Sequence, residues 1–393
     1  MRISHQRFFH CKVGLAALAT SVDSQVLPEG HTDIAFSFSN NEWSAELQFG
    51  DFDNPDSSSA LNEASLTARD LPAGGTGDYG LPQFGDRFIK PSGILDFTGV
   101  GDREPIWILP QSDVGYTWPG LRNDQTPGTF RSFDPVDSRL DTSEPDQPWI
   151  TIRLIDMNYA GSATNPQFSL WQFQGDFIPW MTTADGIDGT DLFYLEENTH
   201  KHMNWGFSDL GLYRIALKPS AILDGSGVTV EGDVQNVSFA IGTKATWLAT
   251  HYSGDDLFTD SVSGDDSDSD QDGIRLLLEY AFNLDPVVAE VGFLEPSVGT
   301  SGLPAVQLIT AGSSSKLEVE YLRRKASTNP QISYFAEFSD DLSTDGWIEQ
   351  TIESVTSIDD DWERVTVSDT LDTSSAKKRF ARVRVELQDT ISY

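Results

Sequence analysis

Residues 150–154 read ITIRL and residues 213–217 read YRIAL, and in both runs apolar side chains recur at every second position. A period of two is typical of a β-strand that buries one of its faces. The sequence therefore predicts a mainly β protein whose large domain is a β-sandwich with long loops. Similar short runs, separated by Gly, Pro, Asn and Asp, occur at 34–38, 43–47, 107–109, 317–321, 334–338, 364–367 and 380–385.

The expected strands fall into two groups, which suggests a chain of four parts. We expect residues 1–25 to be a signal peptide and residues 26–250 to form the large β-rich domain. Residues 253–286 are expected to be an acidic linker that holds a calcium loop and a short helix. Residues 295–388 are expected to form a smaller C-terminal β-sandwich, close in size to an immunoglobulin-like module.

The N-terminal segment has the features of a secretory address. Residues 1–12 carry three basic residues and no acidic one, and residues 13–19, VGLAALA, are a short apolar run that ends in small residues. This arrangement is typical of a cleaved signal, and the run is shorter than the ~20 residues that span a bilayer. We therefore expect a secreted, extracellular or cell-surface protein without a transmembrane segment.

The net charge of the chain argues against some classes of binding partner. It has 26 Lys and Arg against 61 Asp and Glu among 393 residues, a net charge of −35. A chain this acidic repels phosphate backbones, which argues against nucleic acid as a partner. The single cysteine, Cys11, allows neither an internal disulfide nor a cysteine metal cluster.

Residues 268–279, DSDQDGIRLLLE, fit the D-x-D-x-D-G-x5-E spacing of an EF-hand calcium loop. In such a loop three carboxylates surround the cation, a glycine makes the turn, position 7 offers its carbonyl, and a glutamate closes the coordination with two oxygens. The alternative is a solvated acidic linker that matches the spacing by chance. The expected Ca²⁺ ligands are Asp268, Asp270, Asp272, the carbonyl of Ile274, and Glu279.

The surroundings of this loop differ from those of a paired EF-hand. Residues 253–272 contain eight Asp and no Lys or Arg, and residues 255–267 are too polar to predict the preceding helix. The only predicted helix lies within residues 273–286, GIRLLLEYAFNLDP. This lone loop-helix resembles dockerin and thrombospondin-type calcium repeats, and a joint of secreted Verrucomicrobia and Planctomycetes proteins. We expect a structural role, in which Ca²⁺ cancels the repulsion among the carboxylates and stiffens the joint.

Two short motifs supply candidate ligands for a transition metal. His200 and His202 form an H-x-H pair, and alternate residues of a strand face the same side about 6–7 Å apart. His31 and Asp33 show the same spacing and offer a third imidazole and a carboxylate. Three imidazoles with an open position would suit zinc, copper, nickel or manganese. The alternative is a surface pair, or imidazoles that satisfy buried hydrogen bonds beside Trp205 and Phe207.

Residues 28–220 contain several strings with a family resemblance, which are EGHTDI (29–34), PIWILPQ (105–111), WPG (118–120), HKHMNWGF (200–207) and GLYR (211–214). They resemble the choice-of-anchor M domain, also called the actinobacterial surface-anchored protein domain. The family's usual H-V-D is replaced by a motif with Thr32 in the middle. The resemblance implies metal capture at the cell surface beside a metal-type ABC transporter. It also implies that His31, His200 and His202 are the recurrent imidazoles, with Asp33 as a weaker candidate.

The sequence favours a binding protein over an enzyme. It contains no G-x-S-x-G, H-E-x-x-H or P-loop motif. Three tryptophans in loop-like settings, Trp118, Trp171 and Trp180, could stack on sugars, so a glycan-binding adhesin is one alternative. A purely structural surface display protein, with calcium at the linker and no other ligand, is another.

Overall fold

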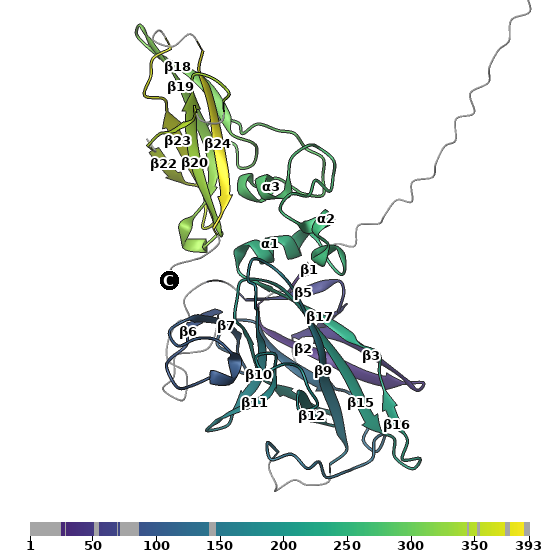
Figure 1. Ribbon diagram of the computed structural model, residues 1–393. Helices are drawn as coiled ribbons and strands as arrows, with labels where there is room; N and C mark the ends of the chain where they lie inside the picture. Colours follow the sequence, from purple (N-terminus) through teal and green to yellow (C-terminus); the bar gives the residue numbers. More distant parts are fainter. Residues whose placement is uncertain are drawn as a thin grey trace, which may run out of the picture.

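The computed structural model describes residues 25–27, 29–50, 55–68, 70, 86–140, 147–343, 346–351, 354–373 and 378–388. Figure 1 shows a large β module, a smaller C-terminal β module, and the helices α1, α2 and α3 between them. The described part is mainly β and is built of several sheets, so the predicted fold class is confirmed. Nearly all of the expected signal peptide, residues 1–24, lies outside the described residues.

One layer of the large module is a seven-stranded sheet. The antiparallel pair β9 (Trp149–Ala160) and β15 (Gly211–Ile222) contains the two runs quoted at the outset. In β9 the side chains of Ile150, Ile152 and Leu154 are buried and those between them are partly exposed, as the alternation predicted. The other strands are β1 (Gln25–Val26), β5 (Ala64–Ala68), β17 (Gln235–Ile241), β16 (Thr229–Glu231) and β12 (Leu192–Glu196).

The second layer consists of two five-stranded sheets, β13-β8-β2-β3-β4 and β11-β10-β14-β7-β6. They are linked where β13 continues through Met203 into β14, so one stretch of chain crosses from the first sheet to the second. The strands of the first sheet are β13 (Thr199–His202), β8 (Trp118–Asn123), β2 (His31–Ser39), β3 (Glu42–Gly50) and β4 (Pro55–Ala60). Those of the second are β11 (Phe177–Thr182), β10 (Phe168–Phe173), β14 (Asn204–Phe207), β7 (Pro105–Leu109) and β6 (Asp86–Ile89).

All three sheets of the large module contribute to one hydrophobic core. Ile34 from β2, Trp205 from β14 and Phe239 from β17 are fully buried in it, and the last two rings lie 5.3 Å apart. Each buried side chain of this size contributes roughly 1.5–3 kcal/mol of transfer free energy. The large module is therefore a single β-sandwich whose second layer is split into two sheets.

The C-terminal module is a smaller sandwich of two sheets around its own core. Val319, Tyr321, Phe338 and Val365 lie at the centre of that core. The four-stranded sheet consists of β18 (Ala305–Ala311), β19 (Ser314–Arg324), β23 (Trp362–Ser368) and β22 (Ser354–Ser357). The three-stranded sheet consists of β21 (Ile348–Glu349), β20 (Ile332–Ser339) and β24 (Phe380–Leu387).

The segment between the two modules is more helical than the sequence predicted. It holds α1 (Thr243–His251) and α2 (Asp260–Ser263) in addition to the expected helix, α3 (Leu276–Phe282). The prediction of a single helix was therefore wrong, because α1 is short, rich in threonine and held by burial of three small and aliphatic residues. The 3-10 turns are η1 (Asp96–Thr98), η2 (Asp256–Phe258) and η3 (Ala326–Thr328).

Helix α3 connects the cores of the two modules. Leu276, at its first turn, packs with Ala245 of α1 and Leu257 of η2. Tyr280 and Phe282, further along the helix, are buried in the core of the C-terminal module. Because the predicted calcium loop leads directly into α3, the loop lies where it can hold both modules.

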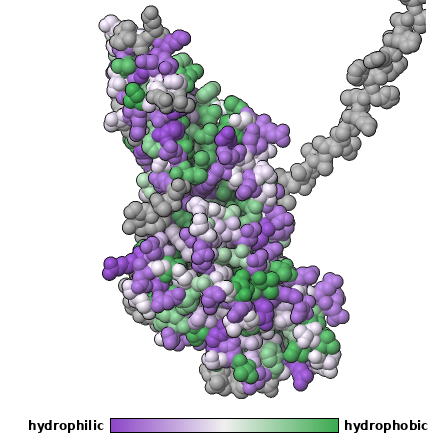
Figure 2. Space-filling view, in the orientation of Figure 1, coloured by the Kyte–Doolittle hydropathy of each residue, from purple (hydrophilic) through white to green (hydrophobic). Residues whose placement is uncertain are grey.

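The visible surface is largely hydrophilic. Figure 2 shows hydrophilic residues over most of this face of both modules, with hydrophobic residues in smaller groups. None of the helices in the described part is both long and apolar enough to cross a membrane.

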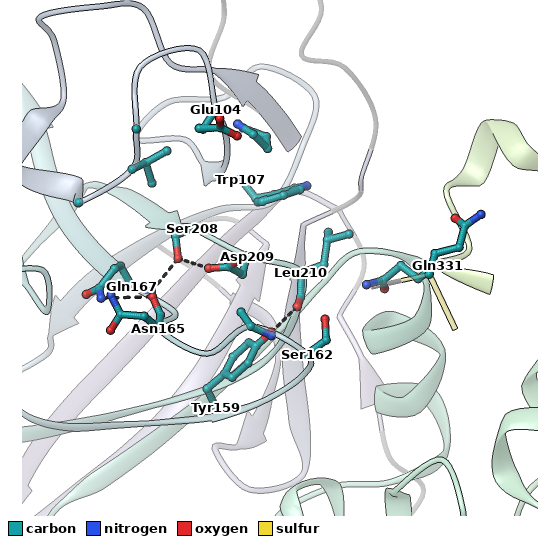
Figure 3. A pocket seen from close by; sticks show the side chains of 16 residues that line it. Glu104, Trp107, Tyr159, Ser162, Asn165, Gln167, Ser208, Asp209, Leu210 and Gln331 are labelled. Carbon is teal, nitrogen blue, oxygen red and sulfur yellow. Dashed lines mark hydrogen bonds between the residues drawn. The ribbon is translucent and has the colours of Figure 1, made fainter. Parts of the chain in front are cut away.

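A cavity of about 390 Å³ lies beside the junction of the modules (Figure 3). Tyr159, Ser208 and Asp209 of the large module line it together with Gln331 of the C-terminal module. The Tyr159 hydroxyl donates a hydrogen bond to the Leu210 carbonyl at 2.7 Å. None of the predicted metal ligands lines this cavity, so the candidate site lies elsewhere.

Candidate functional site

The register of three strands brings the predicted transition-metal ligands together. Strand β2 runs parallel to β8, and β8 runs antiparallel to β13. Asp33 therefore lies opposite Gly120, which in turn lies opposite His202, while His31 and His200 occupy the neighbouring rows. All four predicted ligands project from the outer face of the sheet, because the intervening residues of β2 face the core.

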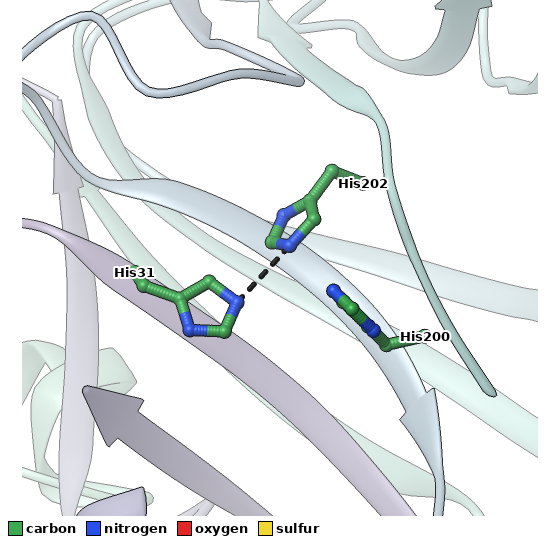
Figure 4. Close-up of side chains that lie close together, drawn as sticks. All are labelled: His31, His200 and His202. Carbon is green, nitrogen blue, oxygen red and sulfur yellow. Dashed lines mark hydrogen bonds between the residues drawn. The ribbon is translucent and has the colours of Figure 1, made fainter. Parts of the chain in front are cut away.

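The three imidazoles point toward one another (Figure 4). The Nε2 atoms of His31 and His202 lie 3.0 Å apart, and one ring nitrogen from each of the three histidines lies within 4.8 Å of the others. Two nitrogens bound tetrahedrally at about 2.1 Å from a metal would lie ~3.4 Å apart. The separation between His31 and His202 is close to this value, and His200 brings a third nitrogen to within 4.8 Å of both.

Asp33 places a buried carboxylate in the same group. Its side chain is only 1% exposed, and within the described ranges neither oxygen accepts a hydrogen bond. Oδ2 lies 3.4 Å from Nε2 of His31 and Oδ1 lies 3.8 Å from Nε2 of His202, longer than ordinary charge-assisted hydrogen bonds. Burial of a carboxylate is costly, and these long contacts to imidazoles compensate for it only weakly, so this environment fits a cation.

The surroundings of the three histidines set the tautomer of His31 and favour the neutral form of His200 and His202. Nδ1 of His31 donates a hydrogen bond to the Gly50 carbonyl at 2.5 Å, which leaves Nε2 as the nitrogen that faces His202. The adjacent Asp33 carboxylate raises the pKa of His31. Burial lowers the pKa of His200, and it lowers the pKa of His202 to about 4. Near neutral pH the last two imidazoles therefore carry lone pairs that a metal can use.

Gly120 makes room for the group, and the sequence analysis did not assign it this role. A Cβ atom at Gly120 would lie 2.4 Å from Oδ1 of Asp33 and 3.0 Å from the ring of His202. Because Gly120 has no side chain, it leaves space in the middle strand that the side chains of Asp33 and His202 occupy. Trp118 covers the group, with its ring centroid 4.6 Å from that of His31 and 4.3 Å from that of His202.

Gly120→Ala is expected to remove transition-metal binding while leaving the large module folded. The added methyl group would displace Asp33 and His202, whereas the strand backbone at this position suits any residue. Metal content after dialysis measures the first effect and the near-ultraviolet circular dichroism spectrum measures the second. Gly189→Ala, where a Cβ meets no atom within 4 Å, is the control. Metal binding equal to that of the wild type would contradict the assigned role of Gly120.

The predicted calcium loop also brings its acidic residues together. One carboxylate oxygen from each of Asp268, Asp270 and Asp272 lies within 4.8 Å of the others. Gly273 adopts φ of 91°, as a sharp turn requires, and its N–H donates to Asp268 at 3.1 Å. The N–H of Ile274 donates to Asp272 at 2.7 Å. The loop is thus curled around its carboxylates as the spacing predicted.

Glu279 supplies a buried carboxylate on α3 next to this loop. It is 1% exposed, and its Oε1 atom has no hydrogen-bond partner among the described residues. Burial, followed by the charges of Asp270, Asp272 and Asp268, raises the pKa of Glu279 to about 8. Glu279 lies outside the closest group of three carboxylates. A cation between Glu279 and the loop would reduce the repulsion among the four carboxyl groups.

The tryptophans that motivated the glycan alternative do not form a platform. Trp171 in β10 and Trp180 in β11 are 0% and 3% exposed, and Trp118 packs on two histidines. The loop-like appearance of these residues in the sequence was misleading, because two of them lie in strands of the core. The observation that supported a sugar-stacking groove is therefore lost.

No protein-family model matches this chain, and no curated protein matches its sequence. The resemblance to the choice-of-anchor M domain stays a prediction. The candidate function consequently depends on the geometry of the two carboxylate-containing groups.

Proposed function

We propose that this chain is a non-enzymatic binding protein in which His31, Asp33, His200 and His202 hold one divalent transition-metal ion. The observation that carries the proposal is the buried carboxylate of Asp33, which accepts no hydrogen bond in the described part of the chain and lies among three imidazoles. Three nitrogens and a carboxylate form a donor set typical of divalent transition metals such as Zn²⁺ or Mn²⁺. The site is on the outer face of a sheet, and its histidines are partly buried.

Capture of the ion fits this site better than catalysis. The ligands come from strands β2 and β13, which are held in place by the intervening strand β8. Trp118 packs against the group and restricts access to it. A site of rigid ligands beneath an aromatic ring is suited to hold an ion.

We further propose that the loop from Asp268 to Glu279 binds Ca²⁺ and that this ion has a structural role. Three acidic side chains gather there beside a buried glutamate, and hard oxygen ligands suit Ca²⁺. Helix α3, which follows the loop, packs against the core of each module. Ca²⁺ would therefore fix the joint between them.

We also propose that the protein acts in an extracellular or cell-surface setting and passes its metal to a transporter. The signal-like N-terminus and the resemblance to surface-anchored domains motivate this proposal. Free Ca²⁺ is abundant outside cells, so a modest affinity at the joint would suffice there. A glycan-binding adhesin has no comparable support in the structure.

Asp33→Asn is expected to have opposite effects in the absence and presence of metal. In chelator-treated protein it should stabilise the fold by about 1–3 kcal/mol, because an amide does not require a counter-charge. In excess Zn²⁺ or Mn²⁺ the variant should bind more weakly and lose the stabilisation that metal gives the wild type. Urea unfolding under both conditions measures the two effects.

Asp134→Asn is the matched control, because Asp134 is an exposed carboxylate outside the site. It should change neither stability nor metal binding. If Asp33→Asn instead destabilised the metal-free protein, Asp33 would have a structural partner and the proposal would lose its main support.

A further inference from the structure

A buried amide oxygen lies beside Asp33, and the four predicted ligands do not account for it. Gln48 of β3 is the direct cross-strand partner of Asp33. Directly opposed residues of an antiparallel pair project from the same face, with Cβ atoms about 4.5–5.5 Å apart. The row across the sheet therefore reads Gln48, Asp33, Gly120, His202.

The orientation of the Gln48 amide is fixed by a neighbour. Its Nε2 donates a hydrogen bond to Oε1 of Glu46, 2.9 Å away on the same strand. The amide oxygen, Oε1, thus faces away from that contact, is buried, and has no donor among the residues that the structure describes. A buried amide oxygen without a partner costs about 1–3 kcal/mol unless something binds it.

Three of the unpartnered atoms on this face are hydrogen-bond acceptors. Both carboxylate oxygens of Asp33 and the amide oxygen of Gln48 are acceptors, and none of them meets a donor in the described ranges. A cation satisfies several acceptors at once, which no single neutral donor can do. The three imidazole nitrogens and these three oxygens give six atoms that could bind a metal ion.

We propose that Gln48 Oε1 is a further ligand of the ion, so that the site binds its metal with more than four ligand atoms. This inference rests on the proposed transition-metal site. Three imidazoles with a carboxylate and an amide oxygen form a mixed nitrogen and oxygen set that suits Mn²⁺ or Fe²⁺, which favour high coordination numbers. Zn²⁺, which is satisfied by four ligands, would need Gln48 least.

Gln48→Leu tests the proposal, because leucine fills similar volume without the amide. The variant and the wild type, both as the full chain stripped with chelator, are titrated with Mn²⁺ and Zn²⁺. We expect Mn²⁺ affinity to fall by at least about 10-fold and Zn²⁺ affinity to stay unchanged. Ser44→Ala is the control, because Ser44 lies on the same strand but away from the metal group. This variant should change neither affinity.

Co²⁺ provides a spectroscopic readout that a merely structural role would not change. Tetrahedral Co²⁺ absorbs visible light strongly, and Co²⁺ with five or six ligands absorbs weakly. The wild type is expected to give the weak spectrum, and Gln48→Leu should shift it toward the strong one. A wild-type spectrum of the tetrahedral kind, or identical spectra and Mn²⁺ affinities for both proteins, would overturn the role of Gln48.

The two proposals fail in different ways. If the wild type bound none of these ions, the transition-metal function itself would be wrong. If it bound them with the same affinity and spectrum as Gln48→Leu, the function would stand with four ligands and Gln48 would be excluded. If Gln48→Leu lost its fold, Gln48→Glu, which keeps an oxygen at this position, should retain a Co²⁺ spectrum of high coordination. A tetrahedral spectrum in that variant would contradict the proposal.

Discussion

His202→Ala is expected to lower the affinity for a transition-metal ion by at least about 100-fold. This loss is larger than the roughly 10–100-fold loss caused by removing a residue that only supports a metal ligand. His202 is central to the group, because its Nε2 lies 3.0 Å from that of His31 and 3.8 Å from Asp33. Removing it takes away a ligand and also leaves the Asp33 carboxylate with one fewer neighbour. Competition with a chromogenic chelator measures the affinity.

Lys201→Ala is the matched control for this variant. Lys201 lies between the two histidines on β13, but it is exposed and alternation directs it to the other side of the strand. The control should bind metal as the wild type does. Equal binding by His202→Ala would show that His202 is not a ligand and would contradict the proposed site.

Removal of Ca²⁺ is expected to lower the melting temperature, and Asp270→Ala should abolish this dependence. Binding at 1,000 times the dissociation constant stabilises a protein by about 4 kcal/mol. Asp270 is a suitable target because Oδ2 of its carboxylate is buried without a partner, and burial raises its pKa. Differential scanning calorimetry with and without chelator gives both values.

Asp266→Ala is the control, since Asp266 lies in the same acidic segment but forms only an exposed ion pair with Arg275. Such surface pairs contribute little to stability, so this variant should respond to Ca²⁺ as the wild type does.

Glu279→Gln gives a second test, because it removes a buried carboxyl group while keeping the shape of the side chain. It should raise the stability of chelator-treated protein and lose the response to Ca²⁺. A wild type insensitive to chelator would contradict the calcium assignment.

Features encoded within a few residues were predicted well. The period of two in β9 and β15 identified half-buried strands, because burial of one face requires it. The spacing of the predicted calcium loop is also local, and its three aspartates lie close together, while Ca²⁺ binding itself stays a prediction. Helix α1 was missed because its weak intrinsic propensity is outweighed by packing against both η2 and α3. Trp171 and Trp180 were misjudged because a single sequence does not show which strands become central.

The sequence by itself determined the mainly β class, the acidic character and the two short ligand motifs. The assembly of the motifs into one group depended on tertiary structure, because His31 and His202 are 171 residues apart. Only the pairing of β2, β8 and β13 places Gly120 between Asp33 and His202 and so creates space for an ion. The burial that leaves the Asp33 carboxylate and the Gln48 amide oxygen without a hydrogen-bond donor in the described ranges likewise arises only when the sheet has formed, since an unfolded chain would leave both side chains in water.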